Sequence, residues 1–176
     1  MASRELLVEQ IPHLRRYARV LLGHARVDEA DDLVQDTLER ACARWQLWQS
    51  QRSLRPWLFS IMHNLFIDQL AGSLPVQALD EVDEPQVAAQ QELRLEALGM
   101  LRLVQELALP LREVVLLVCV EGLAYREAAQ ALGIPMGTVM SRLSRARAQL
   151  QQWTQHTAAS GAAARPALQV IAGKAP

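Results

Sequence analysis

Residues 122–147 read GLAYREAAQALGIPMGTVMSRLSRAR, and this stretch decides the fold of the second half of the chain. Its spacing predicts two helices joined by a tight turn, a helix-turn-helix. Ala128 and Ala129 are small where the second helix must cross the first. Gly133 allows the positive backbone angle of a tight turn, and Pro135 favours a new helix start.

The second helix of this motif is expected to have one apolar and one polar face. At about 100° per residue, four side chains fall on one inward face: Val139, Leu143, Ala146 and Leu150. The opposite face is formed by Ser141, Ser144 and Arg145, flanked by Arg142 and Arg147. Such a face suits side chains that read base edges while arginines contact phosphates, so DNA binding is predicted. The alternative is an ordinary solvated helix face, which three arginines alone would not exclude.

The charges of the chain are segregated. Its net charge of -1 and pI near 6.4 seem to argue against a nucleic-acid partner. However, residues 80–92 carry five acids and no base, whereas residues 136–150 carry three arginines and no acid. The first stretch repels phosphate and the second attracts it, so the overall charge leaves DNA binding open.

Apolar periodicity predicts an all-α protein of two small helical domains. Helical spacing runs through residues 7–21, 34–45 and 56–65 and resumes at residue 98, while no segment alternates with period two. Two prolines and the acidic cluster make residues 73–91 typical of a flexible linker. The expected organisation is a first domain over 1–72, an acidic linker over 73–91, a helix-turn-helix domain over 92–154 and a disordered tail over 155–176.

Composition and spacing disfavour membrane, metal and enzyme functions. No apolar run approaches the roughly 20 residues needed to cross a bilayer, and the N-terminus lacks the pattern of a signal peptide, so a cytoplasmic protein is expected. Cys42 and Cys119 are predicted to be small buried hydrophobes, because neither has a CxxC partner. The adjacent Asp31 and Asp32 would point about 100° apart on a helix, which does not suit chelation. No catalytic residue, metal or cofactor is therefore expected.

The string LGIPxGTVxSRLSRAR at residues 132–147 resembles the promoter-reading helix-turn-helix of extracytoplasmic-function (ECF) sigma factors of bacterial RNA polymerase, in the sigma-70 family. The resemblance implies that this motif reads the upstream, minus-thirty-five promoter element. Met140 stands where many members carry Lys or Arg, which should weaken one polar contact. The residues implied to contact this element are Thr138, Met140, Ser141, Arg142, Ser144, Arg145 and Arg147.

Residues 31–36, DDLVQD, resemble the polymerase-binding stretch of the same family. There, an acidic amphipathic helix packs on the helical clamp of the largest polymerase subunit. Periodicity places Val34 inward and leaves four side chains for the polymerase: Asp32, Leu33, Gln35 and Asp36. The alternative is that these acids only favour a helix N-terminus.

Residues 54–68 resemble the helix of the family that melts the promoter and recognises the minus-ten element. Opening a duplex exchanges base stacking, on average about 1.4 kcal/mol per step, for contacts with protein. The resemblance implies a pocket for a flipped base, and the implied minus-ten residues are Trp48, Trp57, Ile61, His63 and Asn64. Trp57, and likewise Trp48, could instead fill the core, and His63, where the family often has Arg, could instead be a packed or solvated histidine.

The sequence therefore predicts a sigma factor that binds core RNA polymerase and promoter DNA and directs transcription initiation. The resemblance also implies a possible anti-sigma factor as an inhibitory partner. A stand-alone regulator that binds operators as a dimer is the main alternative, but it would leave residues 31–36 and 54–68 without a role.

Overall fold

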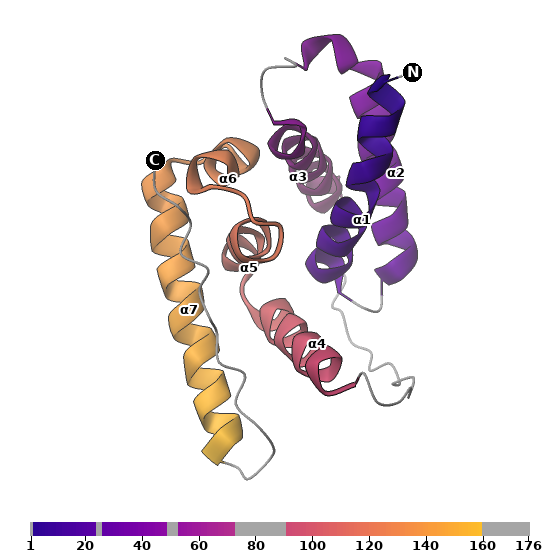
Figure 1. The fold of residues 1–176 in the computed structure, drawn as a ribbon. Coiled ribbons are helices and arrows are strands. Elements are labelled where there is room, and N and C mark those ends of the chain that lie inside the picture. The colour runs from indigo at the N-terminus through magenta and orange to yellow at the C-terminus, as the bar shows by residue number, and fades with distance from the viewer. Residues whose placement is uncertain (1, 24–25, 49–52, 73–90, 160–176) are drawn as a thin grey trace.

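The computed structural model describes residues 2–23, 26–48, 53–72 and 91–159, and these form helices and short connections without any strand (Figure 1). This confirms the all-α prediction. The expected linker and most of the expected tail lie outside the described residues. The elements are α1 (Ala2–Leu22), α2 (Val27–Ala43), the 3-10 turn η2 (Trp45–Leu47), α3 (Leu54–Gly72), α4 (Gln91–Glu106), α5 (Leu109–Val115), the π-helical turn η3 (Leu116–Val120), α6 (Tyr125–Leu132) and α7 (Met136–Ala159).

Helices α1, α2 and α3 pack on one another and form the first half of the molecule. Their core is built from large apolar side chains that are almost fully buried, including Leu14, Leu33, Phe59 and Met62. Tyr17 and Phe59 meet in a tilted ring contact, with centroids 5.0 Å apart. Burying side chains of this size stabilises by about 1.5–3 kcal/mol each, which fixes the three helices against one another.

Helices α5, α6 and α7 also pack on one another, and their buried side chains continue the same apolar cluster. Val114, Leu117 and Leu143 are at most 2% exposed there. Ala128 and Ala129 are also buried, as expected for small residues between two helices of a helix-turn-helix.

The two halves lie side by side rather than apart. Helix α3 packs against α6, and α1 contacts α4, α5 and η3 (Figure 1). The helix that carries the expected minus-ten residues therefore faces the helix-turn-helix half.

Several local predictions were wrong. Cys42 and Cys119 are both exposed rather than buried. The helix that leads to Cys119 turns into a π-helical segment at Leu116, and Val120 beside it is only half-buried. The π turn shifts the side chains around the helix axis, so the expected inward face is not continued.

Helix ends also differ from expectation. Helix α2 has Arg26 at its N-cap, and Asp28 lies in its first turn. Helix α7 continues to Ala159, into the stretch expected to be a disordered tail. None of the described helices is long and apolar enough to cross a membrane.

Candidate nucleic-acid interface

The turn between α6 and α7 is fixed by glycine and by backbone hydrogen bonds. Gly133 adopts φ +63°, the left-handed region expected from the sequence. The Ile134 N–H donates to the Ala129 carbonyl at 3.1 Å, which closes α6 in the pattern of a Schellman motif. At the other end of α6, the Glu127 carboxylate accepts the N–H of Ala124 at 2.9 Å. These contacts fix where α7 leaves the turn.

Helix α7 presents the two faces that the sequence predicts. The four inward side chains are each at most 4% exposed: Val139, Leu143, Ala146 and Leu150. Ser141, Ser144 and Arg145 are exposed on the opposite face, and Arg142 and Arg147 flank it half-buried. Met140 is 49% exposed, while Thr138 is half-buried near the start of the helix. The residues expected to contact DNA thus lie along one surface of one helix.

Two further residues belong to this surface and were missed by the sequence reasoning. Tyr125, at the start of α6, and Gln151, late in α7, line a shallow hollow together with Met140, Ser144 and Arg147. Gln151 lies one residue beyond the last inward position of α7, and Tyr125 lies on the preceding helix. Helical periodicity within α7 could not have identified Tyr125.

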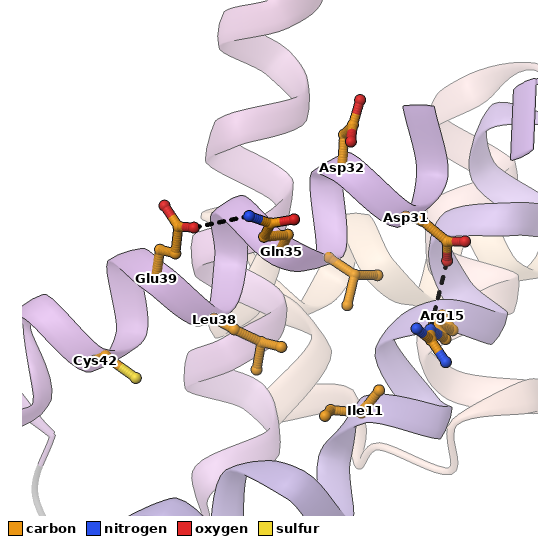
Figure 2. A pocket seen from close by; sticks show the side chains of 9 residues that line it. Ile11, Arg15, Asp31, Asp32, Gln35, Leu38, Glu39 and Cys42 are labelled. Carbon is orange, nitrogen blue, oxygen red and sulfur yellow. Dashed lines mark hydrogen bonds and ion pairs between the residues drawn. The ribbon is translucent and has the colours of Figure 1, made fainter. Parts of the chain in front are cut away.

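An open groove runs between α1 and α2, and it contains part of the expected polymerase-binding stretch (Figure 2). Gln35 lines it and donates to Glu39 Oε1 at 3.0 Å. Asp32 also lines it and is exposed. Asp31 lies at one end, with Oδ1 3.4 Å from Arg15 Nε. The groove therefore combines an apolar floor, from Ile11 and other residues, with acidic and amide side chains along its rim.

The expected polymerase-binding set needs one correction. Leu33 was predicted to be available to a partner, but it is 0% exposed. Helix α2 packs against both α1 and α3, so its buried stripe is wide enough to include Leu33 as well as Val34. Asp36 is exposed as expected. The apolar residue that does line the groove is Leu38, four positions after Val34.

The tryptophans expected near the minus-ten element form a cluster. The Trp45 ring lies 4.9 Å from that of Trp48 and 6.3 Å from that of Trp57. All three are partly buried against the core. The indole nitrogen of Trp48 is buried without a hydrogen-bond partner among the described residues. Trp45 was not singled out from the sequence, although it is the ring that joins the other two.

The remaining minus-ten residues on α3 differ in their accessibility. Asn64 is exposed, whereas Ile61 is only 7% exposed. His63 is not free either, because its Nδ1 lies 2.6 Å from Glu113 Oε1 on α5. In this arrangement, therefore, Ile61 and His63 are not available to a DNA strand.

The described residues hold no group of three or more His, Cys, Asp or Glu side chains arranged to bind a metal ion. The Cys119 side chain is exposed, but neighbouring residues partly desolvate its thiol and raise the pKa, although the nearby Arg147 guanidinium acts in the opposite direction.

Comparison with known proteins identifies both halves. Residues 7–63 match the Sigma2 domain of PhyR, and residues 98–150 match Sigma-70, region 4. The chain is 36% identical over 150 residues to the ECF RNA polymerase sigma factor EcfG of Rhodopseudomonas palustris (strain TIE-1), covering 84% of this chain and 82% of that protein. It is 32% identical over 152 residues to the RNA polymerase sigma factor NccH of Alcaligenes xylosoxydans xylosoxydans, covering 78% of this chain and 82% of that protein.

Two solved structures share the fold. One is the sigma factor RpoE in complex with the anti-sigma factor NepR from Bartonella quintana, with a TM-score of 0.67 and 28% identity, covering 88% of this chain and 97% of that one. The other is CnrH in complex with the cytosolic domain of CnrY, with a TM-score of 0.64 and 26% identity, covering 86% of each chain.

The fold and these matches define a two-domain helical transcription factor with a DNA-binding helix-turn-helix. More specifically, the chain belongs to the ECF sigma factors of the sigma-70 family. It is an RNA polymerase sigma factor for transcription initiation, and sigma factors are not enzymes.

Proposed function

We propose that the first half of the chain, residues 1–72, binds the clamp helices of the largest polymerase subunit through the groove between α1 and α2. The exposed carboxylates of Asp32 and Asp36 suit a basic partner. Gln35 adds a hydrogen-bonding amide beside the apolar side chain of Leu38. An apolar groove with an acidic rim is the surface that an amphipathic basic helix requires.

We propose further that α7 reads the minus-thirty-five element. Its exposed serines and Arg145 lie between two flanking arginines, Arg142 and Arg147. A helix with this layout places short polar side chains at base edges and cations at phosphates. This exposed face of α7 is the observation that carries the proposal of promoter reading. The outward side chains are exposed and the inward side chains are buried, in the order that helical spacing predicts.

For the minus-ten element, we propose that the tryptophan cluster and Asn64 capture bases of the opened strand. Trp48 offers a ring and a buried indole N–H without a partner among the described residues. Asn64 is exposed on α3 and can pair with a base edge. Ile61 and His63 would join this surface only after α3 separates from the second half.

The two halves would contact promoter elements that lie apart on DNA, so we propose that residues 73–91 connect them as an acidic linker. Its carboxylates would avoid the DNA and suit a basic channel of the polymerase. Because the polymerase is in the cytoplasm, we propose the same location for this chain. Because the similar sigma factor RpoE is bound to the anti-sigma factor NepR in its solved structure, we also propose that this chain has an anti-sigma factor.

Binding to core RNA polymerase tests the polymerase-docking surface. We expect the chain to co-elute with the core enzyme in gel filtration, and we expect Asp32→Ala with Gln35→Ala to abolish co-elution. Asp28→Ala is the matched control, since Asp28 is exposed on the same helix but does not line the groove. Absence of core binding together with tight dimeric binding to duplex DNA would favour a stand-alone regulator instead.

A further inference from the structure

Two carboxylates of the second half are buried against the first half. Glu113 on α5 is 4% exposed, and Glu121 just after η3 is 3% exposed. Buried carboxylates are costly unless they are paired and hydrogen-bonded. Both have partners on α1 or α3, more than 45 positions away in the sequence.

Glu121 is held by a bidentate ion pair and a histidine. Arg16 donates from Nε to Glu121 Oε1 at 2.8 Å and from Nη2 to Oε2 at 2.9 Å. His13 Nδ1 lies 2.8 Å from the same Oε2. The carboxylate raises the pKa of Arg16 through this hydrogen bond. Two residues one helical turn apart on α1 thus bind one carboxylate of the other half.

Arg55 on α3 extends this network. Its Nη1 donates to the backbone carbonyl of Glu121 at 3.1 Å, and its Nη2 lies 2.6 Å from His13 Nε2. If His13 carries its proton on Nδ1, the ring donates to Glu121 and accepts from Arg55. The three basic side chains then share one carboxylate and one carbonyl.

The π-helical turn η3 sets the direction of Glu121. The Glu121 N–H donates to the Leu116 carbonyl at 2.8 Å, five residues earlier, and the Leu123 N–H donates to the Leu117 carbonyl at 2.9 Å. A π turn inserts one residue into the helical register and is frequent at functional sites. Here it ends the helix with the carboxylate turned toward α1 and α3.

Two more polar contacts cross between the halves. His63 Nδ1 lies 2.6 Å from Glu113 Oε1. Arg112 donates from Nη1 to the carbonyl of Leu21, near the end of α1, at 2.7 Å. We call the contacts of Glu113, Glu121 and Arg112 with the first half the carboxylate clasp.

The interface around the clasp contains buried polar groups beside its apolar contacts, and these polar groups favour separation of the halves. Tyr17 is fully buried beside the clasp, and its hydroxyl has no partner among the described residues. Burial, with Glu113 and Glu121 nearby, raises the pKa of Tyr17 well above its usual value. Each of these groups would regain water on opening, whereas a permanent interface is more apolar.

From these contacts we infer that the carboxylate clasp holds the free protein closed and withholds α3 from DNA until the halves separate. His63, an expected minus-ten residue, is occupied by Glu113 in the closed form. The functional consequence rests on the proposed sigma function, because only then must the two halves reach separate promoter elements. The closed form itself is a property of the free chain.

Distance measurement between two spin labels in the free protein tests the clasp. One label is attached to Asp28→Cys on α2 and the other to Gln151→Cys on α7, both exposed, in a background in which Cys42 and Cys119 are replaced by serine. Asp28 does not line the groove proposed for the polymerase. The clasp variant is Glu113→Gln with Glu121→Gln, which keeps side-chain shape and removes both charges. Glu9→Gln is the matched control, because Glu9 is exposed on α1.

Wild type and Glu9→Gln should give one narrow distance distribution, with an open population below about 10%. The clasp variant should give a broad distribution in which the open form predominates. Arg16→Gln removes the same ion pair from an exposed side chain and should act in the same direction even if the double variant folds poorly. A broad distribution in wild type, or a narrow one in Arg16→Gln and in a folded double variant, would overturn the inference.

Core polymerase added to the labelled wild type separates this inference from the proposed function. Opening upon addition supports both. If the chain is closed when free and does not bind the core, the result supports the clasp and contradicts the proposed function. A chain that binds the core while its distance distribution stays narrow and unchanged rejects the clasp as a device that must open.

Discussion

Gly133 and Gly137 allow the geometry of the helix-turn-helix to be tested by one chemical change at two neighbouring positions. Gly133 adopts φ +63°, whereas Gly137 lies in the first turn of α7 without a positive φ. A Cβ at either position meets nothing within 4 Å. The effect of an added methyl group is therefore set by the backbone alone, not by a steric clash.

Gly133→Ala should destabilise the protein by about 1–2 kcal/mol, because a left-handed backbone angle costs an L-residue about that much. Gly137→Ala should stabilise it by about 0.5–1 kcal/mol, because glycine within a helix loses more chain entropy than alanine. Gly133→Asn should cost less than Gly133→Ala, since asparagine tolerates the left-handed region.

Urea unfolding followed by circular dichroism at a helical wavelength measures these differences. The two alanine variants should shift the midpoint in opposite directions with an unchanged slope. A Gly133→Ala variant as stable as wild type, or a Gly137→Ala variant destabilised by a similar amount, would refute the assignment of the turn at Gly133.

Three further predictions concern single side chains. Leu143→Ala should reduce stability by about 2–5 kcal/mol in the same urea assay, since Leu143 is 2% exposed, whereas Met140→Ala should change it by less than about 0.5 kcal/mol. Arg142→Ala should weaken promoter DNA binding and lower the slope of log K against log salt by about 0.9 for each phosphate that the arginine neutralises, and an unchanged slope in fluorescence anisotropy would show that Arg142 does not bind phosphate. Cys119 should react with iodoacetamide at pH 8 more slowly than an unperturbed cysteine peptide, because partial desolvation of its thiol raises the pKa and lowers the thiolate fraction. A rate equal to that of the free peptide, measured by mass spectrometry, would contradict this prediction.

The inward face of α7 could be predicted from sequence because it depends only on helical spacing within one segment. Its inward residues follow one another at spacings of four, three and four positions, from Val139 to Leu150. A helix that packs on a core along one side is expected to show this spacing. The same rule failed at Leu33, because α2 packs against two helices and buries a wider stripe. Periodicity also failed at Cys119, where the π turn changes the register of the helix.

The contacts between the halves could not be predicted from the sequence. Glu121 meets His13 across 108 positions, and Glu113 meets His63 across 50. No local pattern encodes such a pairing, and isolated carboxylates and histidines are usually solvated. For the same reason, sequence reasoning assigned His63 to DNA, whereas in the closed arrangement it contacts a carboxylate.

Closure and promoter recognition are linked through α3. The helix that should capture the opened strand lies against the helix-turn-helix half in the free protein. A factor arranged in this way would show little DNA binding by its α3 face without polymerase. The outward face of α7, by contrast, is exposed in the same closed form.

Promoter-dependent transcription in vitro is the direct test of whether this chain directs initiation by core RNA polymerase. The purified chain is added to core RNA polymerase on a library of genomic fragments, and the transcript start sites are sequenced at low and high salt. We expect salt-sensitive initiation at a set of start sites that share an upstream and a downstream promoter element. We expect the double variant Arg142→Ala with Arg145→Ala to abolish this initiation. Initiation no different from that of core polymerase alone would contradict this role.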